Sequence, residues 1–456
     1  MIERIVRHAR EIAAFAHGAA DAELMGLAEE IILDAGALQL PGRREEPPWP
    51  EVAVPGTLLA ARLALREGLP QEAIELAQDM LSRHPLDLYI QRLVNDIHLA
   101  LGLPGWTRAD EDDLARRFCD YPFTRFETNP DGDIRVCCKS WLSVPIGNLT
   151  GGHPREIWNS EPAAYIRRSI LDGRFTYCSR ARCPKILNRV LPYRDELTEP
   201  FQRDLLETGS VVLGAGPRDI KLNHDYSCNL SCPSCRSAVI TAGSEERARL
   251  DRAAESLLFP LLEEARVVEI TGSGDPFASA HFKGILKRIS RTEFPDLMID
   301  LFTNGQLFTK KMWDHLELAG LCRRVVVSVD AVEPDTYHCL RRGGDWTRLM
   351  RNLDFIAELR RAGEFQRVVL VFVVQRENYR QIPDFIRLTR RFGFDEAFLQ
   401  MIARWSQPVA EYEQNNVGLP DHPLHGDFLK VLRDPTLKDP VVNLGTMKTL
   451  YEEALE

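Results

Sequence analysis

Residues 220–237 read IKLNHDYSCNLSCPSCRS, a short apolar strand pattern followed by a loop with three cysteines. These are Cys228, Cys232 and Cys235, separated by three and then by two residues. Three thiolates on one short loop can bind three irons of a cubane cluster and leave the fourth iron open. A zinc site is the alternative, with His224 as its fourth ligand, because structural zinc is held by four side chains. The loop therefore predicts a metal centre directly after a strand.

An alternation of strand and helix patterns continues from this loop. Strand-like apolar runs cover residues 220–223, 266–271, 297–303, 324–330, 368–374 and 396–402. Apolar residues at helical spacing lie between them, in residues 248–265, 282–290, 310–320, 346–363 and 382–393. Strands that alternate with helices pair in parallel, and chemistry in such folds lies at the carboxyl ends of the strands. We predict the α/β class, as an open, partial (β/α)6 barrel of the TIM type.

The composition divides the chain into four parts. Residues 1–105 have helical periodicity and contain a tetratricopeptide-like stretch, which either caps the protein or docks a peptide or partner. Residues 106–200 are rich in cysteine, proline, glycine and aromatic residues and predict a small auxiliary domain. The barrel is expected over residues 210–405, after an irregular linker within 195–219. Residues 406–456 are expected to form a tail of loop and short helix.

Charge and cysteine usage limit the class of protein. The formal net charge of −10 argues against a general nucleic-acid binder, which needs a basic face. No run reaches the roughly 18 apolar residues of a membrane span, and the first residues lack the pattern of a signal peptide. We therefore expect a cytoplasmic protein with no membrane or nucleic-acid partner. Ten cysteines in a reducing compartment indicate metal ligation rather than disulfides.

The three-cysteine loop resembles that of the radical SAM superfamily, whose Cys-x3-Cys-x2-Cys motif matches Cys228, Cys232 and Cys235. The resemblance implies that these cysteines hold a [4Fe–4S] cluster whose open iron binds the amino and carboxylate groups of S-adenosylmethionine. Reductive cleavage of that cofactor would release a 5′-deoxyadenosyl radical, in chemistry that belongs to the cofactor rather than to the protein. The resemblance also implies an electron donor such as flavodoxin or ferredoxin.

Further motifs that resemble this family follow the later strands. TGSGDP at residues 271–276 resembles a Gly-Gly-Glu-Pro motif that meets the methionyl amino group. FTNG at 302–305 and VSVDA at 327–331 end the third and fourth strands, and TYHCLRRGG at 336–344 resembles a segment whose arginine clamps the cofactor carboxylate. The resemblance implies that the following residues bind the cofactor: Gly272, Ser273, Gly274, Asp275, Asn304, Ser328, Asp330, Arg341, Asn378 and Met401.

The adenine site departs from the family pattern, and the pattern says less about the catalytic side chains. Ser234 stands where an aromatic residue commonly packs the adenine, so we expect that contact to come from Met401 and Ile402. Cys339 lies after the fourth strand and is a candidate donor of a hydrogen atom or proton. Burial as a small apolar side chain is the alternative for this cysteine. Tyr337, in the same segment, is the second candidate for a catalytic role.

A second group of cysteines lies in the small domain and consists of Cys119, Cys137, Cys178 and Cys183. A Pro-Asp-Gly turn closes a hairpin that brings the first two together. The pattern resembles the SPASM and twitch auxiliary-cluster domains, which implies a second iron–sulfur cluster, although four thiolates would also satisfy zinc. Cys137 is favoured over Cys138, since adjacent strand residues point to opposite faces. This domain precedes the barrel, whereas in comparable family members it follows.

Together the resemblances imply a radical SAM oxidoreductase or maturase with two iron–sulfur clusters. The radical would abstract hydrogen from a peptide or protein, and the second cluster would accept an electron, which gives oxidative modification. The first alternative is a dehydrogenase or epimerase that acts on a sugar or another small molecule. A zinc-binding interaction scaffold, which docks partners through the helical region, is the alternative from a different class.

Overall fold

The computed structural model describes residues 108–456, apart from residues 143, 181–182, 271 and 404–406. The helical, tetratricopeptide-like region expected over residues 1–105 lies outside the described residues. The described chain forms two compact units. The first unit contains residues 108–122, 137–145 and 161–212. The second unit contains residues 123–136, 146–160 and 213–456.

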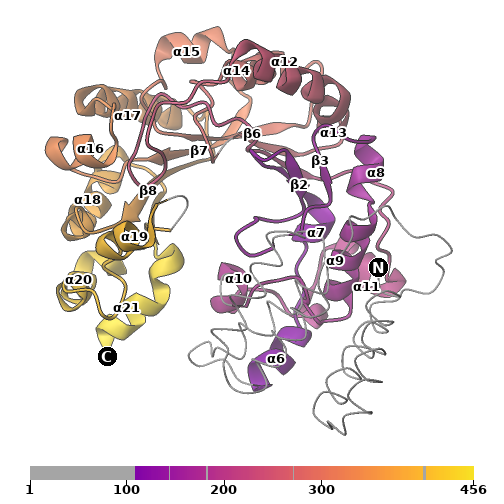
Figure 1. The fold of residues 1–456 in the computed structure, drawn as a ribbon, viewed down its shortest axis with the longest axis horizontal. Helices are drawn as coiled ribbons and strands as arrows, with labels where there is room; N and C mark the ends of the chain where they lie inside the picture. The colour runs from indigo at the N-terminus through magenta and orange to yellow at the C-terminus, as the bar shows by residue number, and fades with distance from the viewer. Residues whose placement is uncertain (1–107, 143, 181–182, 271, 404–406) are drawn as a thin grey trace, which may run out of the picture. The chain divides into compact units, whose positions relative to one another are not determined.

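One sheet of ten strands runs through the second unit (Figure 1). Its strand order is β10-β9-β8-β7-β6-β5-β4-β1-β2-β3. Neighbours from β10 to β1 are parallel, whereas β1 pairs with β2, and β2 with β3, in antiparallel fashion. The strands are Arg125–Thr128 (β1), Asp133–Arg135 (β2), Gly147–Asn148 (β3), Asp219–Leu222 (β4), Val267–Ile270 (β5), Met298–Thr303 (β6), Cys322–Ser328 (β7), Arg367–Val374 (β8), Glu396–Met401 (β9) and Val442–Asn443 (β10).

Helices connect the parallel strands, and Figure 1 shows them along one side of the sheet. Side-chain caps start three of them, because Ser279, Thr309 and Asp345 each accept a hydrogen bond from the backbone N–H three residues later. The helices between β4 and β9 include Ser244–Ala253 (α12), Ala254–Leu258 (η2, a π-helical turn), Phe259–Leu262 (α13), Ala280–Arg288 (α14), Lys310–His315 (α15), Pro334–Leu340 (α16), Trp346–Arg361 (α17) and Ile382–Phe392 (α18). The α/β class with a mostly parallel sheet is therefore confirmed.

The central strands β7 and β8 are buried on both faces, which explains their continuous apolar runs. On one face, Val326, Val369 and Val371 form a cluster of buried side chains. On the other face, Phe372 packs its ring against that of Phe385 of α18, with ring centroids 4.7 Å apart. A strand covered in this way cannot alternate polar and apolar residues. The six strands predicted from apolar runs are all present, as β4 to β9.

The predicted small domain of residues 106–200 is divided between the two units. β1 lies within that range, but it pairs in parallel with β4 and so extends the sheet of the second unit. The edge of β4 offers unpaired backbone groups, and β1 satisfies them. The expected hairpin is confirmed, because β1 and β2 are antiparallel and Gly132 in their connection has φ of +83°.

Two segments are more regular than the sequence indicated. Residues 406–456, expected as a tail, contain three helices and the strand β10. The expected linker contains α11, which begins at Pro200 and ends at Thr208, and Gly209 caps it in a left-handed conformation with φ of +62°. The remaining elements are Arg108–Ala115 (α6), Tyr121–Thr124 (α7), Pro154–Trp158 (α8), Glu161–Leu171 (α9), Pro184–Leu187 (α10), Arg194–Glu196 (η1), Pro200–Thr208 (α11), Tyr379–Gln381 (η3), Val409–Asn415 (α19), His425–Leu432 (α20), Pro435–Lys438 (η4), Gly445–Met447 (η5) and Lys448–Leu455 (α21). Within the described part of the chain, every helix is too short or too polar to cross a lipid bilayer.

Replacing Gly132 by alanine should lower the free energy of unfolding by about 1–2 kcal/mol, because a side chain is strained in this left-handed backbone conformation. An added Cβ would also lie 3.0 Å from Nδ2 of Asn148. Gly151→Ala is the matched control, since a Cβ added there has no neighbour within 4 Å. Chemical unfolding followed by circular dichroism measures both variants. Equal unfolding midpoints would contradict the role of Gly132.

Candidate functional site

A cavity of about 620 Å³ lies along one face of the sheet in the second unit. The three cysteines of the loop after β4 line it. The cavity brings these cysteines together with six other residues that were predicted to bind the cofactor, namely Gly272, Ser273, Gly274, Asn304, Ser328 and Arg341. All six follow or end neighbouring parallel strands, whose carboxyl ends meet at one edge of the sheet.

Each of the three cysteine sulfurs has a nitrogen donor beside it. Nδ2 of Asn304 lies 3.7 Å from Sγ of Cys228, and Nη1 of Arg341 lies 3.8 Å from Sγ of Cys232. The sulfur of Cys235 has Nε of its neighbour Arg236 at 3.4 Å. Donors of this kind stabilise negative charge on sulfur and tune a metal centre from its second shell of contacts.

Burial acts in the opposite direction on two of these thiols. It raises the pKa of Cys228 to about 11 and also raises the pKa of Cys232, against the lowering effect of Arg341. Buried thiols of this kind stay protonated unless a positive centre compensates the thiolate charge. Among the described residues, no three His, Cys, Asp or Glu side chains already lie in position to share one ion. The donor set of three thiols with three N–H partners nevertheless fits an iron–sulfur cluster with one open iron.

Hydrogen bonds hold the cysteine loop to its surroundings. The backbone N–H groups of Cys235 and Arg236 both donate to the carbonyl of Cys232, at 2.9 Å, which forms a tight turn. The Arg236 guanidinium donates to the carbonyls of Tyr226 and Ser273 and so joins the loop to the glycine-rich turn after β5. Arg236 was not predicted from the sequence, although a basic residue directly after the third cysteine was a usable signal.

The glycine-rich turn packs directly under the loop. A Cβ on Gly274 would lie 2.5 Å from the carbonyl oxygen of Ser227 and 2.7 Å from that of Asp225, so that only glycine fits. Asp275 is fully buried and does not belong to the cavity lining. Its carboxylate accepts hydrogen bonds from the Thr303 hydroxyl and the Asn304 backbone, both at 2.8 Å. The structure thus gives Asp275 a supporting position, and its expected contact with the cofactor ammonium stays a prediction.

Asp330 also lies behind the cavity wall. One of its carboxylate oxygens lies 2.6 Å from Nη2 of Arg341, and the other accepts from the Val373 N–H at 2.8 Å. Asn378 donates to the carbonyl of Asp330 at 2.8 Å and holds it in a left-handed conformation with φ of +61°. Asp330 and Asn378 therefore orient Arg341, and of these three residues only Arg341 lines the cavity.

The two candidate catalytic residues and the two adenine candidates, Met401 and Ile402, are not part of the cavity lining. Tyr337 of α16 is fully buried, and its hydroxyl accepts a hydrogen bond from Gln306 at 2.8 Å. Burial raises the pKa of this tyrosine to about 12. Cys339 on the same helix is exposed. Met401 ends β9 and is half-buried. Their catalytic and adenine-binding roles stay predictions.

A buried polar chain accounts for His224, the candidate fourth zinc ligand. Its Nδ1 lies 2.7 Å from the Thr128 hydroxyl, and its Nε2 lies 2.9 Å from Nε2 of His281. Nδ1 of His281 in turn lies 2.6 Å from Oδ1 of Asp251. Both ring nitrogens of His224 are thus engaged within the protein. This geometry does not favour zinc ligation by His224.

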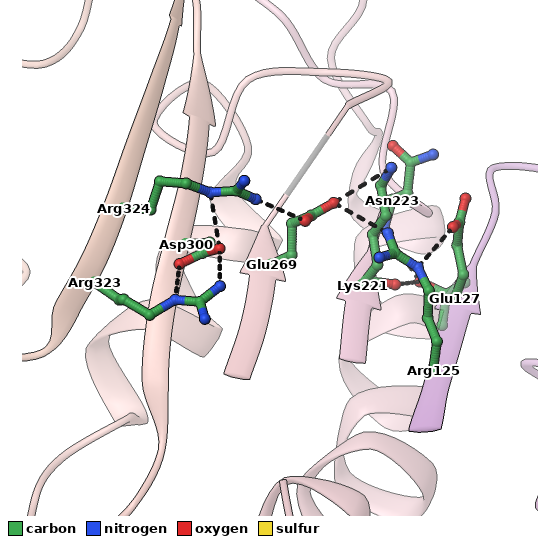
Figure 2. A network of polar contacts seen from close by, with 9 residues as sticks. Arg125, Glu127, Lys221, Asn223, Glu269, Asp300, Arg323 and Arg324 are labelled. Atoms are coloured by element: carbon green, nitrogen blue, oxygen red, sulfur yellow. Dashed lines mark hydrogen bonds and ion pairs between the residues drawn. The ribbon is translucent and has the colours of Figure 1, made fainter. Parts of the chain in front are cut away.

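A row of charged side chains crosses four neighbouring strands of the sheet (Figure 2). Lys221, Glu269, Asp300 and Arg324 are register partners on four neighbouring strands. Nη2 of Arg324 lies 3.2 Å from Glu269, and its Nε lies 3.0 Å from Asp300. Although burial opposes ionisation, Lys221, Arg125 and Arg324 hold the pKa of Glu269 below its usual value. One charged residue recurring inside each apolar run was the sequence signal for this row.

The second group of cysteines lies in the first unit. Burial raises the pKa of Cys119 to about 12 and raises the pKa of Cys178 well above its usual value. The neighbouring Cys119, Cys183 and Cys137 add to the shift at Cys178. The indole N–H of Trp141 lies 3.2 Å from the sulfur of Cys137. Cys178 thus lies within electrostatic range of the other three predicted thiols, which fits a shared centre. Cys138 is a neighbour of Cys183, so it remains a second candidate beside Cys137.

Comparison with known families supports both metal sites. Residues 222–389 match the model of the radical SAM superfamily, and residues 119–184 match SPASM, an iron–sulfur cluster-binding domain. The iron–sulfur domain precedes the radical SAM domain, in the order that the sequence indicated. A radical SAM domain implies a [4Fe–4S] cluster and S-adenosylmethionine, and a SPASM domain implies an auxiliary iron–sulfur cluster. The predicted radical SAM and SPASM domains are thus confirmed over these residues, and with them the cofactors that such domains imply.

Relatives of known name match part of the chain. The GTP 3′,8-cyclase of Alkaliphilus metalliredigens is 30% identical over 178 residues, which are 38% of this chain and 53% of the relative. The GTP 3′,8-cyclase of Desulforamulus reducens is 30% identical over 202 residues, which are 42% and 56% of the two chains. The chain therefore spans about half the length of these relatives.

Solved structures with similar chains superpose only loosely. SuiB of Streptococcus suis is 15% identical with a TM-score of 0.35, over 64% of this chain and 67% of SuiB. TYW1 with a lysine-pyruvate adduct bound is 18% identical with a TM-score of 0.32, over 49% and 74% of the two chains. Similarity of this extent supports no statement about substrate.

Replacing Asp275 by alanine should lower the free energy of unfolding by about 2–4 kcal/mol, because its buried carboxylate accepts several hydrogen bonds. Asp275→Asn keeps one acceptor oxygen and should lose less. Urea unfolding of the two variants and of the unchanged protein gives the comparison. An alanine variant as stable as the unchanged protein would refute the supporting position of this carboxylate.

Acidification should destabilise the protein through His224 and His281. Burial lowers the pKa of both imidazoles, so below about pH 6.5 the unfolded chain binds protons that the folded chain does not. The contribution of the two neutral histidines to the free energy of unfolding is fully present above that pH. It falls as the pH decreases, by at most about 1.4 kcal/mol per pH unit for each histidine. His281→Gln should reduce this slope between pH 7 and pH 5, and His315→Gln, on the exposed side of α15, should not. Parallel slopes for all three proteins would contradict the assignment.

Proposed function

Since the chain carries a radical SAM domain and a SPASM iron–sulfur domain, we propose that it is an enzyme that cleaves S-adenosylmethionine and abstracts hydrogen from a substrate. The observation that carries this proposal is the single cavity lined by Cys228, Cys232 and Cys235 together with the glycine-rich turn, Ser328 and Arg341. The strand order that gathers them also supports an open, partial barrel as the form of this unit.

The three cysteines of the loop would hold the first cluster, and Asn304, Arg341 and Arg236 would stabilise its thiolate ligands through the donors described above. When bound and reduced, a cluster of this type supplies one electron to the sulfonium of S-adenosylmethionine, so that a C–S bond breaks and methionine and a 5′-deoxyadenosyl radical form.

Other residues of the cavity wall would position the cofactor. Gly272 and Gly274 present backbone rather than side chains to the cavity, which lets the methionyl group approach closely. Arg341 carries a positive charge that suits the cofactor carboxylate, and Asp330 fixes its direction. The apolar side chains of Val326, Val369 and Phe398 would keep water from the reacting centre.

We propose that Cys119, Cys137, Cys178 and Cys183 hold the auxiliary cluster. When bound, that cluster supplies an acceptor for the electron that a substrate radical loses, which makes the net reaction an oxidation. Trp141 and Lys185 lie beside two of these sulfurs and would stabilise their thiolate forms. The electron that starts each turnover would come from a small carrier such as flavodoxin or ferredoxin.

A peptide or protein is the proposed substrate, as the resemblance to SPASM and twitch enzymes implies. A small molecule is the second candidate, because two of the relatives are named GTP 3′,8-cyclase. The cationic lining of the cavity is compatible with either class, provided that the substrate carries an anionic group.

Cys232→Ala should abolish formation of 5′-deoxyadenosine and remove about four irons per chain, because it deletes a ligand of the first cluster. Cys178→Ala is the reciprocal variant, which should lose the auxiliary iron and keep the first cluster. Both are measured by iron and sulfide analysis and by product analysis after reduction with dithionite under anaerobic conditions. Two zinc ions per chain and no cleavage would support the scaffold alternative. A Cys232→Ala variant that still forms 5′-deoxyadenosine would disprove the site.

A further inference from the structure

Two arginines stand side by side in the part of the cavity farthest along the strands from the cysteine loop. Arg324 of β7 and Arg367 of β8 are register partners on neighbouring parallel strands. Both line the cavity that the three cysteines also line. Like charges in direct register destabilise a sheet unless an opposite charge compensates them. The pair therefore needs negative charge close to both guanidinium groups.

Carboxylates compensate each arginine on the side away from the other. Arg324 pairs with Glu269 and Asp300, and Arg367 pairs with Glu396. Asp300 is fully buried and the Glu396 side chain is 10% exposed, whereas Arg324 is 30% and Arg367 is 55% exposed. The acids thus lie beneath the cations, and the face that the pair presents to the cavity is positive.

The cavity lining as a whole is also positively charged. Its charged residues are Lys221, Arg236, Arg324, Arg341, Arg367 and the single acid Glu396. This excess of positive charge lies in a chain whose formal net charge is −10. Arg236 and Arg341 are directed at the cysteine sulfurs, whereas Arg324 and Arg367, although both are paired with carboxylates, keep side chains that are 30% and 55% exposed. A concave site of one sign attracts ligands of the opposite sign.

We infer that Arg324 and Arg367 bind an anionic group of the substrate, either a carboxylate or a phosphate, and so set its orientation in the cavity. The inference rests on the proposed function, because it assumes that this cavity holds the substrate. Guanidinium groups bind planar or tetrahedral oxyanions through paired N–H donors. Val326 and Val369, two residues farther along the same strands, provide an apolar wall for the part of the substrate that approaches the radical.

Glu396 is the residue that competes with such an anion. It pairs with Arg367, and Nδ2 of Asn443 donates to its other oxygen at 2.6 Å. Removing the negative charge of Glu396 would free Arg367 for a ligand. Removing Arg367 would leave Glu396 without its cation and make the site more negative. The two changes therefore have opposite effects on anion binding, which a purely structural ion pair would not produce.

The test is calorimetric titration of the full chain, with its clusters reconstituted under anaerobic conditions, using pyrophosphate and glutarate as separate probes. Arg367→Gln should weaken binding about tenfold or more, the usual effect of losing a charged hydrogen-bonding partner. Glu396→Gln should strengthen binding several-fold. Arg360→Gln is the matched control, because this arginine of α17 has an equivalent pairing with Asp395 outside the cavity lining.

Each probe identifies one source of the anionic group. Binding of pyrophosphate alone indicates a phosphate, and binding of glutarate alone indicates a carboxylate. Either result supports the inference if Arg367→Gln weakens the binding of that probe. The inference is overturned if neither probe binds, if Arg367→Gln binds as tightly as Arg360→Gln, or if Glu396→Gln weakens binding. Arg324→Gln, checked for an unchanged unfolding midpoint, provides an independent second variant.

A separate assay distinguishes this inference from the proposed function. The same preparations are reduced with S-adenosylmethionine present and no substrate, and 5′-deoxyadenosine is measured. If the unchanged protein and Arg367→Gln both form it, the function stands and the titrations alone decide the role of the arginines. If the unchanged protein forms none, the proposed function fails whatever the probes show.

Discussion

Negative charge on buried sulfur is the constraint around which the described site is built. Burial raises the pKa of Cys228 and Cys232, so their thiolate forms require compensation from a metal centre and from nearby N–H groups. The chain supplies the second part of that compensation through Asn304, Arg341 and Arg236, one donor for each sulfur. These donors in turn come from three different segments, which the fold must bring together around one loop.

The parallel sheet achieves this through register. Because β4 to β9 run in the same direction, the segments that follow them gather at one edge, and buried carboxylates then fix those segments. Asp275 ties the end of β6 to the glycine-rich turn, and Asp330 holds the guanidinium of Arg341. The charged row uses the same register to place cations in the part of the cavity that lies along the strands.

Much of this organisation could be predicted from the sequence, for a physical reason. Strand β8 is a continuous apolar run because a helix and the cavity cover its two faces, and apolar residues mark the neighbouring strands as well. β1 and β10 were missed because they are short and owe their conformation to partners far away in the sequence. The sequence also does not show in which direction a side chain points. Spacing placed Asp275 and Asp330 at strand ends, but only the folded backbone shows that they turn inward to N–H and guanidinium donors.

The central claim is that three thiolates of one loop hold a cluster with an iron open to S-adenosylmethionine. Its most direct test is the electron paramagnetic resonance spectrum of the full chain, reduced under anaerobic conditions and recorded before and after the cofactor is added. We predict an iron–sulfur signal that changes in shape when S-adenosylmethionine binds, and Cys178→Ala should keep that change. A chain that contains zinc instead of iron, or a signal that the cofactor leaves unaltered, would contradict the account.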